Sequence, residues 1–462
     1  MNSNPRLRPC PACDKPISKR ARQCPHCQHG LPENMWRMKI KPWFVPAMVL
    51  FVVVGLIFVA FGIFRSVESP EKGLPGLASA AGNWPTWRGP GYNNTAVGDA
   101  PPVTWDEKKN IIWKTEVPGR GHATPVVWGD RIFLPTADEE QQVLSLVCVH
   151  SETGSLIWNT EIHRGGLMNK SKKNSYASST VACDGQRIYV PFIVDGGLWL
   201  TATDLDGRIL WQKRVTAFQS EHGYGSSPLV YKSLVILAGD HLEKSFLTGL
   251  DVATGEIVWQ TPRKRGGSYG SPVMARLANS EQLLLSGQGE VTSYNPLNGQ
   301  PVWRSRANAR STVGTIAWYE PFVFASTLNG TICIRADGKG NVSRSHVVWE
   351  NRVKANVPSP LIVDDRILVV DDEGFVTCLA ISTGRQLWKK RLGGNVSASP
   401  VLAAGHVYLP LEDGQLFVFK AGEKFELVSK NDLGDGGFAS PVICEGQIFL
   451  RTDHYLYCIG HG

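Results

Sequence analysis

Four cysteines near the N-terminus have the spacing of metal ligands. They occur as two Cys-x-x-Cys pairs, Cys10/Cys13 and Cys24/Cys27, with ten residues between the pairs. Each pair can present two thiolates on one side of a turn, and four thiolates complete the tetrahedral shell of a structural zinc ion. Zinc binding of this type yields on the order of 10–16 kcal/mol, enough to fold a segment with almost no apolar core. We therefore expect a zinc site built from these four cysteines.

The surrounding segment, residues 1–36, resembles a small zinc ribbon. Ribbons of this kind usually have glycine after the second cysteine of each pair, where this chain has Asp14 and Gln28. His26 and His29 are close enough to replace a thiolate, although four cysteines make this unnecessary. A pair of redox-active dithiols is the alternative, but no βαβ pattern surrounds the motif in the sequence.

Residues 43–64 are 22 consecutive residues without a charge. As a helix they would span about 33 Å, the thickness of a hydrocarbon core. The alternative is a cleaved signal peptide, because residues 78–80, Ala-Ser-Ala, resemble a cleavage site. That tripeptide lies too far beyond the stretch, and the stretch is too long for a signal peptide. We predict one transmembrane helix, followed by a linker rich in Pro, Gly, Ser and Ala at residues 65–82.

Charge predicts the orientation of this helix. The formal net charge is +7, and residues 1–41 account for it with nine Lys/Arg against two Asp/Glu. The positive-inside rule places the ribbon in the cytoplasm and residues 83–462 on the periplasmic or extracytoplasmic side. Thiolate zinc ligands agree with a reducing compartment. The part of the chain after residue 41 is neutral overall, which argues against nucleic acid as its partner.

One hairpin unit returns down most of the remaining chain. In Gly249–Trp259 a short apolar strand leads to Thr254-Gly255, where glycine can adopt the positive φ of a tight turn, and a second strand carries Trp259. Near-copies of the unit end in Trp158, Trp211, Trp303 and Trp388.

A second signature precedes the hairpins by about twenty to thirty residues. It consists of a small residue and proline, an apolar pair, a turn and an alternating strand. It begins at Ala123, Ser226, Gly270, Pro358, Ser397 and Phe438, with weaker forms at Ser178 and Val313. Starts roughly 40–55 residues apart, filled with short strands, indicate a propeller of four-stranded blades.

The hairpin unit also resembles the pyrroloquinoline-quinone-like (PQQ-like) propeller repeat. That pattern is Ala-x-Asp-x-x-Thr-Gly-x-x-x-Trp, and residues 249–259 match all of it except the first alanine. The resemblance implies that each tryptophan docks against a neighbouring blade. Residues 84–90, WPTWRGP, resemble the opening segment of bacterial propellers of this family.

The two ends of the repeat region are complementary. Residues 111–115 look like the last strand of a blade, bearing Trp113, whereas Phe438–Ile459 supplies first strands and then ends. Joining them closes a ring and removes an exposed edge. We therefore predict an all-β fold for residues 83–462: an eight-bladed PQQ-like β-propeller closed by N- and C-terminal strands. A seven-bladed ring is the alternative, because residues 336–341 replace the turn of the fifth blade and the seventh hairpin ends at Val428 without tryptophan.

The propeller region contains six cysteines. Cys148, Cys333, Cys378 and Cys458 share one repeated position in the third strand, and Cys183 and Cys444 share another in the first. Repetition at equivalent positions predicts small buried packing residues and mostly free thiols.

Loops that precede the first strands should surround one mouth of the propeller channel. We therefore take as candidate binding residues the aromatic, His, Arg and Asn side chains of these loops: His122, Tyr176, His222, Tyr224, Tyr269, Arg310, Asn356 and Phe438. The alternative is that they only build tight loops between blades.

Quinoprotein dehydrogenases of this fold bind PQQ over a calcium ion, with an aspartate base and often a disulfide of adjacent cysteines. The propeller sequence has no Cys-Cys pair and no His/Asp/Glu cluster spaced like a metal or acid–base site. The resemblance is therefore closer to non-catalytic, BamB-like members, which use the propeller for protein contacts. We expect a membrane-anchored, non-catalytic module that binds protein or polymer, with zinc in the ribbon and without PQQ. A PQQ-dependent oxidoreductase is the alternative, and a small-ligand sensor is a third possibility.

The zinc site can be tested directly. Cys10→Ser or Cys24→Ser should abolish stoichiometric zinc, measured by elemental analysis of the purified full chain, because a tetrahedral thiolate shell loses one ligand. His26→Ala should retain the metal. Full zinc content in either cysteine variant, or its loss in the histidine variant, would contradict the assignment of these ligands.

Overall fold

The computed structural model describes residues 7–9, 15–18, 26, 82–106, 108–307 and 312–461. The chain divides into two compact units, Met1–Glu71 and Lys72–Gly462.

In the first unit, β1 (Leu7–Pro9) pairs antiparallel with β2 (Pro16–Ser18). The four cysteines predicted to bind zinc, Cys10, Cys13, Cys24 and Cys27, lie outside the described residues, and so does the predicted span 43–64. Within the described ranges, no helix has the length and hydropathy needed to cross a bilayer. The zinc ribbon and the membrane anchor therefore stay predictions.

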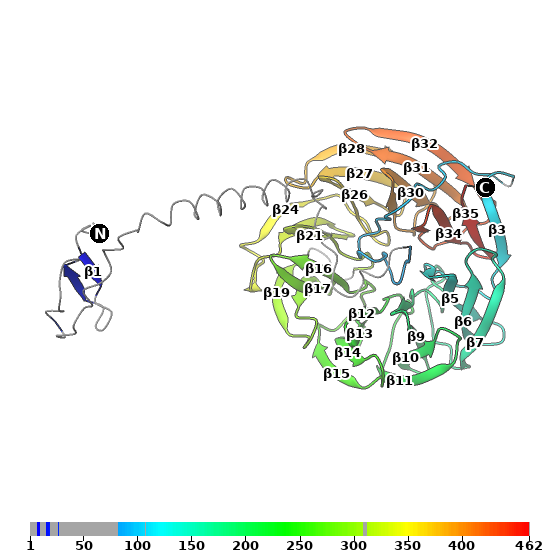
Figure 1. Cartoon of the computed structure of the whole chain (residues 1–462), viewed down its shortest axis with the longest axis horizontal. Coiled ribbons are helices and arrows are strands. Elements are labelled where there is room, and N and C mark those ends of the chain that lie inside the picture. The colour runs from blue at the N-terminus through cyan, green and yellow to red at the C-terminus, as the bar shows by residue number, and fades with distance from the viewer. Residues whose placement is uncertain are drawn as a thin grey trace, which may run out of the picture. The chain divides into compact units, whose positions relative to one another are not determined.

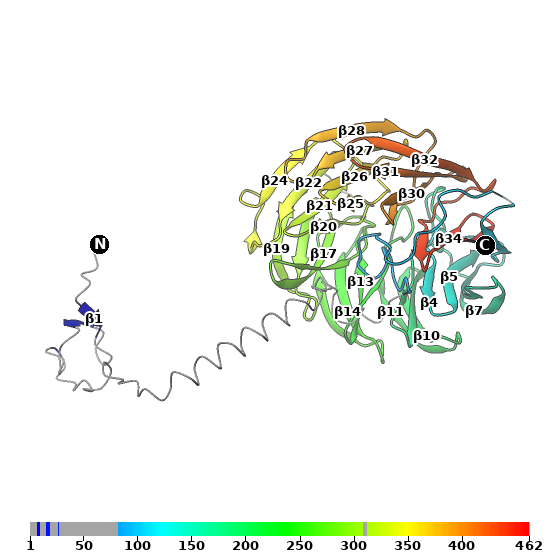
Figure 2. The same cartoon turned by 45° about the horizontal axis from the view of Figure 1, so that its top comes forward.

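In the second unit, the strands between residues 108 and 461 form eight sheets arranged as the blades of a propeller, as predicted (Figure 1). Each blade is an antiparallel meander whose last strand lies at the periphery. The four strands of a blade lie side by side, as Figure 2 shows for the blade that contains β26, β27 and β28. The middle strands are almost completely buried, and the core lies between the faces of neighbouring blades.

The blades are numbered along the chain. Blade 1 contains β4 (Val126–Trp128), β5 (Arg131–Asp138), β6 (Val143–His150) and β7 (Leu156–Arg164); blade 2 contains β8 (Ala182–Cys183), β9 (Arg187–Val194), β10 (Gly197–Asp204) and β11 (Ile209–Ala217); blade 3 contains β12 (Leu229–Tyr231), β13 (Leu234–Gly239), β14 (Phe246–Asp251) and β15 (Ile257–Pro262); blade 4 contains β16 (Val273–Leu277), β17 (Ser280–Gly287), β18 (Glu290–Tyr294) and β19 (Pro301–Arg306). Blade 5 contains β20 (Ala317–Tyr319), β21 (Phe322–Thr327), β22 (Gly330–Arg335) and β24 (Val347–Asn351); blade 6 contains β25 (Leu361–Val363), β26 (Arg366–Val370), β27 (Phe375–Ala380) and β28 (Gln386–Arg391); blade 7 contains β29 (Val401–Ala403), β30 (His406–Pro410), β31 (Gln415–Ala421) and β32 (Phe425–Asp432); blade 8 contains β33 (Val442–Cys444), β34 (Gln447–Arg451), β35 (Tyr455–Ile459) and β3 (Ile111–Glu116).

Blade 8 is built from both ends of the propeller region, as predicted. β3 pairs antiparallel with the C-terminal strand β35, and Trp113 lies opposite Cys458 in this register. The ring therefore closes through backbone hydrogen bonds between segments more than 300 residues apart in the sequence.

The tryptophan of the outer strand packs on the next blade. Trp113 donates its indole N–H to the Ser151 carbonyl of blade 1 at 2.9 Å, and its ring covers Gly154 in the turn. Gly154 has a φ of 69°, and a Cβ atom there would come within 2.6 Å of the indole. The same indole-to-carbonyl bond is repeated in other blades by Trp158, Trp211, Trp349 and Trp388. Trp259 also packs on the turn glycine of the next blade.

Trp303 is buried in a cluster with Ala336 and Val342 of the next blade, but its hydrogen bond differs from those of the other tryptophans. Its N–H donates to Gln282 Oε1 of its own blade at 2.8 Å, and Gln282 Nε2 donates to the Ala336 carbonyl of blade 5 at 3.1 Å. Blade 5 lacks the usual glycine turn at this point. Instead, β23 (Gly340–Asn341) pairs in parallel with β19 as a fifth strand of blade 4. A bridge through the Gln282 side chain replaces the direct hydrogen bond from the indole to a carbonyl, because the turn that would supply this carbonyl is absent.

A second set of contacts joins the blades at their inner ends. In blades 2 to 8, a hydroxyl group two residues before the first strand accepts the backbone N–H of the equivalent residue in the preceding blade, at distances from 2.8 to 3.3 Å. Between residues 124 and 440, the bonds run in order through Thr124, Thr180, Ser227, Ser271, Thr315, Ser359, Ser399 and Ser440. We call this set the hydroxyl ring.

Residues 84–95, which we call the N-terminal plug, lie across the inner ends of the blades. Trp84 pairs with Val127 of blade 1, Thr86 Oγ1 donates to the Pro228 carbonyl of blade 3, and the Arg88 guanidinium donates to the Pro360 carbonyl of blade 6. Asn94 Nδ2 reaches the Pro400 carbonyl of blade 7. One short segment therefore forms hydrogen bonds with blades 1, 3, 6 and 7.

The chain after the plug covers the outer strand of blade 7. There Ser429, rather than Val428, occupies the tryptophan position of the repeat. Ser429 Oγ donates to the Val103 carbonyl, and the Trp105 N–H donates to Asn431 Oδ1 at 3.0 Å. The Trp105 side chain is buried with residues of blades 7 and 8, so the preceding chain supplies an indole at this seam.

The six propeller cysteines are buried free thiols, which confirms the prediction. Cys148, Cys333, Cys378 and Cys458 each lie directly opposite a tryptophan of the neighbouring strand, where a small side chain leaves space for the indole. Burial raises the pKa of the Cys148 thiol to about 12.

The packing of tryptophan on glycine can be measured with a matched pair of variants. Gly129 has a φ of 57°, and a Cβ atom there would meet nothing within 4 Å. Gly129→Ala should therefore cost about 1 kcal/mol of folding free energy for the left-handed backbone alone. Gly154→Ala should cost at least about 3 kcal/mol, because the methyl group also displaces the Trp113 indole. Urea denaturation of the two variants compares these costs, and equal costs would contradict the proposed role of the indole.

Candidate functional site

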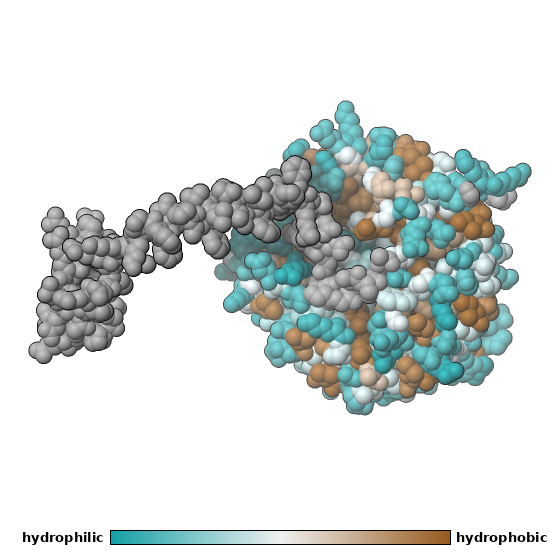
Figure 3. Space-filling model, in the orientation of Figure 1, coloured by the Kyte–Doolittle hydropathy of each residue, from teal (hydrophilic) through white to brown (hydrophobic). Residues whose placement is uncertain are grey.

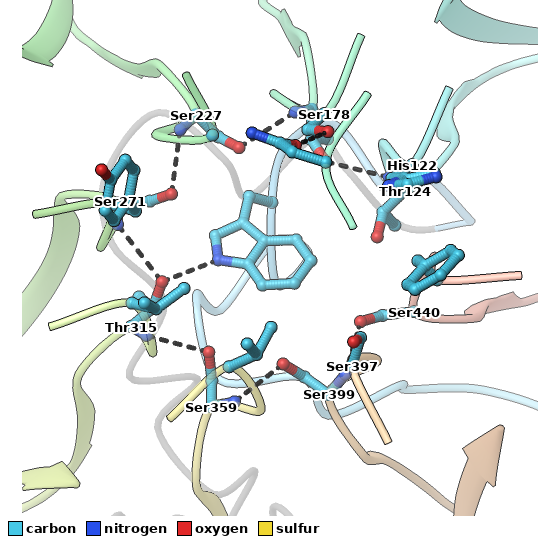
Figure 4. Close-up of a pocket in the computed structure, with 18 of the residues that line it drawn as sticks. His122, Thr124, Ser178, Ser227, Ser271, Thr315, Ser359, Ser397, Ser399 and Ser440 are labelled. Carbon is cyan, nitrogen blue, oxygen red and sulfur yellow. Dashed lines mark hydrogen bonds between the residues drawn. The ribbon is translucent and has the colours of Figure 1, made fainter. Parts of the chain in front are cut away.

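A central cavity of about 420 Å³ lies on the propeller axis inside the hydroxyl ring. Trp87 of the plug lines it, and its indole N–H donates to Thr315 Oγ1 at 3.0 Å. The close-up in Figure 4 shows the ring hydroxyls gathered around this cavity. The cavity is thus formed where the inner ends of the blades meet the plug.

The plug closes one end of this cavity. In each blade, the residue that carries the ring hydroxyl comes shortly before the first strand. The plug bonds to carbonyl groups just after the ring position, such as those of Pro228, Pro360 and Pro400. The predicted mouth residues precede the ring position by two to five residues, for example His122 before Thr124. Because the first strands of all blades run in the same direction, the carbonyl groups bonded by the plug and the predicted mouth residues lie at opposite ends of the channel. The cavity therefore opens toward the predicted mouth.

The structure brings five of the predicted binding residues to this cavity. His122, His222, Tyr269, Asn356 and Phe438 all line it. The His122 ring stacks on the Phe438 ring with centroids 4.2 Å apart, and the His222 and Tyr269 rings are 6.0 Å apart. Ligand binding by these residues stays a prediction.

The other three predicted binding residues lie elsewhere. Tyr224 is buried within blade 3, where its hydroxyl donates to the Ala238 carbonyl at 2.7 Å and its ring packs edge-on against Phe218. Tyr176 packs against the core between blades 1 and 2, with the Lys170 ammonium 4.8 Å from its ring centroid. Arg310 lies outside the described residues.

Sequence reasoning missed Trp87 and the role of the hydroxyl ring. A signal for the ring was present, since Ser or Thr stands at this position in every copy of the small-residue motif. For Trp87 there was no comparable signal, because the plug occurs once and has no repeat with which to compare it.

The charged groups at the cavity are hydrogen-bonded within the chain, and Lys173 also has an ionic partner. The Lys173 ammonium lies 3.1 Å from the Glu412 carboxylate, which also accepts a hydrogen bond from Ser397. The Asp372 carboxylate accepts hydrogen bonds from Asn356 Nδ2 and from the Val357 N–H. Among the described lining residues, the cavity therefore offers no unpaired cation to an anionic ligand.

His122 is held in its neutral form. Burial, together with the positive charges of Arg120, Arg451 and Lys170, lowers its pKa from 6.5 to about 3. A base this weak takes up no proton near neutral pH, so the imidazole can form hydrogen bonds but is a poor general base.

The lining does not fit a calcium-bound, carboxylated quinone such as PQQ. Such a cofactor needs cationic groups for its carboxylates and several oxygen ligands for the metal. Lys173 is largely exposed and paired with Glu412, and Asp372 is already hydrogen-bonded. Among the described residues, no group of three or more His, Cys, Asp or Glu side chains could hold a metal ion.

A family model and curated relatives match the propeller region. A family model described as outer membrane protein assembly factor BamB matches residues 145–347 and 341–424. BamB of Yersinia pestis is 21% identical over 359 residues, which cover 75% of this chain and 77% of that protein. BamB of Burkholderia pseudomallei (strain K96243) is 22% identical over 356 residues, which cover 67% of this chain and 87% of that protein.

Solved structures share the fold. The crystal structure of BamB from Moraxella catarrhalis matches with a TM-score of 0.56 and 16% identity, covering 76% of this chain and 97% of that one. The quinohemoprotein alcohol dehydrogenase from Comamonas testosteroni matches with a TM-score of 0.64 and 13% identity, covering 83% and 82% of the two chains. At these identities the likeness concerns the fold alone. Because the family model spans more than half of the 462 residues, this chain belongs to the family described as outer membrane protein assembly factor BamB.

Proposed function

We propose that this chain is a membrane-anchored, non-catalytic scaffold whose propeller binds another protein on the periplasmic or extracytoplasmic side. In this proposal the helix at residues 43–64 anchors the chain, and the zinc ribbon lies in the cytoplasm. The basic residues before the helix support that orientation. The name of the relatives, assembly factor, supports a role in bringing proteins together.

The observation that carries the proposal is a band of exposed aliphatic side chains on the outer strands of four consecutive blades. We call it the outer apolar band, and it consists of Ile112, Leu156, Ile157, Ile209, Leu210, Ile257 and Val258, which are between 38% and 56% exposed. In the view of Figure 3, hydrophobic side chains also reach the surface at several places around the propeller.

The members of the band are neighbours in space because the blades are joined beside them. Trp158 packs on Gly207, so Ile157, next to the tryptophan, lies close to the residues that follow the glycine, Ile209 and Leu210. Single exposed apolar residues are ordinary on a protein surface, whereas a continuous apolar band is typical of a surface that binds a partner.

The outer strand of a blade can accept a further strand. β23 already pairs with the outer edge of β19 in blade 4. Within the described residues, β7, β11 and β15 end their sheets without such a neighbour. An extended segment of a partner protein could therefore add main-chain hydrogen bonds to the apolar contacts of the band.

Crosslinking from apolar and polar side chains at equivalent register positions of the outer strands tests this surface. A photoreactive amino acid at Leu156 or Ile257 in the full-length protein in cells should give a discrete protein adduct. Gln386 occupies the same register position on β28 but carries a polar side chain, and it is the matched control. Adducts of equal yield from position 386, or no adduct from positions 156 and 257, would contradict the proposed docking surface.

The non-catalytic part of the proposal predicts how His122 titrates. NMR spectra of the ring should stay those of neutral imidazole from pH 5 to 8, whereas His454, whose pKa is raised by its hydrogen bond to Asp435, should stay protonated to a higher pH than an ordinary histidine. Since the folded-state pKa of His122 is below the unfolded value, its contribution to stability is complete above pH 6.5 and is lost as pH falls toward 3. Titration of His122 near pH 6.5 would restore it as a candidate acid or base and weaken the proposal.

A further inference from the structure

The hydroxyl ring has a gap at the seam between blades 8 and 1. Ser440 accepts the Ser399 N–H at 2.8 Å, but no equivalent bond runs from Ser440 to Thr124. Thr124 is 2% exposed, lines the central cavity, and its Oγ1 has no hydrogen-bond partner among the described residues. A buried hydroxyl without a partner costs about 1–3 kcal/mol, so this atom is suited to a bond from outside the chain.

A second unpaired polar atom lies beside the first. His122 Nε2 is buried and has no hydrogen-bond partner within the described part of the chain, although the ring stacks firmly on Phe438. Figure 4 shows His122 and Thr124 next to one another on the cavity wall, with Ser440 across the gap. Two unused polar atoms therefore lie beside an aromatic surface at one side of the cavity.

The rest of the ring offers donors to the cavity. The hydroxyl oxygens of Thr180, Ser227, Ser271, Ser359 and Ser399 each accept a backbone N–H, and none of these hydroxyl groups donates a hydrogen bond within the described residues. Their hydrogens remain available to a ligand inside the ring. Aromatic side chains complete the lining: Trp87, Tyr269 and Phe438.

This combination selects a class of ligand. The charged groups disfavour an anionic ligand, because Lys173 is already paired with Glu412 and Asp372 is itself negative, so an anion would lose its hydration without gaining a counter-ion. The circle of hydroxyl groups favours a ligand with many oxygen atoms around its edge, and aromatic surfaces favour a ligand with an apolar face. A sugar ring has hydroxyl groups around its edge and C–H groups on its faces.

We propose that the central cavity binds a neutral polyhydroxylated ring, a free monosaccharide or the terminal sugar of a glycan, anchored by Thr124 Oγ1 and His122 Nε2. The volume of about 420 Å³ lies within the range of small-ligand pockets. The plug closes one end, so a glycan enters with its terminal unit from the open mouth. This site is separate from the outer apolar band and does not depend on a protein partner.

Calorimetric titration of the full-length protein tests the proposal, in a detergent without a sugar head group. The probes are D-glucose, N-acetyl-D-glucosamine and myo-inositol, with maltotriose as a glycan end and D-glucuronate as the charged counterpart of glucose. At least one neutral probe should bind saturably, and glucuronate should bind at least tenfold more weakly than glucose. Tighter binding of maltotriose than of glucose would identify a glycan end as the ligand, and the reverse would identify a free sugar.

Thr124→Val removes the unpaired hydroxyl and retains the shape of the side chain. We expect affinity to fall at least about fivefold, the value of one hydrogen bond. The melting temperature should stay the same or rise, because no hydrogen bond within the protein is lost. Thr312→Val is the matched control, since Thr312 Oγ1 is also buried without a partner among the described residues but does not line the cavity. It should leave affinity unchanged.

Three results would overturn the proposal. They are the absence of saturable binding by every neutral probe at millimolar concentrations, binding of glucuronate as tight as that of glucose, and unchanged affinity in the Thr124→Val variant. A purely structural role of Thr124 would lower the melting temperature without changing affinity.

Discussion

A hydrogen bond from a backbone N–H to the hydroxyl group of the next blade is the interaction on which the propeller depends most. It fixes the height at which each first strand starts relative to its neighbour. Each bond contributes about 1 kcal/mol net, but the bonds act together because blades 2 to 7 are each held on both sides. Tryptophans on the outer strands add a second contact at the periphery, as Trp113 does by donating to the Ser151 carbonyl. Neighbouring blades are thus joined at both their inner and their outer ends.

Closure follows from this constraint. Each blade packs against a neighbour on both faces, so an open row of blades would leave one unused face at each end. Pairing of β3 with β35 closes the ring and removes both unused faces. The plug adds a further restraint from the centre. Trp84, Arg88 and Asn94 tie blades 1, 6 and 7 to one short segment, and Trp87 turns the channel into a cavity with one opening. The candidate site is therefore a consequence of how the ring is held together.

The repeated features of this structure could be predicted from the sequence. The eight starts of the small-residue and proline signature predict the number of blades, and Trp113 together with the C-terminal strands predicts the closure. Features that occur once could not be predicted. Trp303 uses Gln282 because the turn of the next blade was replaced, and the motif alone does not show what replaces it. His222 and Tyr224 are two residues apart in one loop, yet one lines the cavity and the other is buried in the blade. Periodicity identifies a loop but not the direction of its side chains.

The most direct test of this account is native-state hydrogen exchange of the ring amides. Thr124, Ser227, Thr315 and Ser359 lie outside every strand, so a loop in their place would exchange rapidly. The account predicts that their amides exchange as slowly as those of the buried strands, because each is bonded to a hydroxyl of the next blade. The Ser440 amide, which meets no such hydroxyl, should exchange faster. Rapid exchange at all these positions would contradict the central role of the hydroxyl ring.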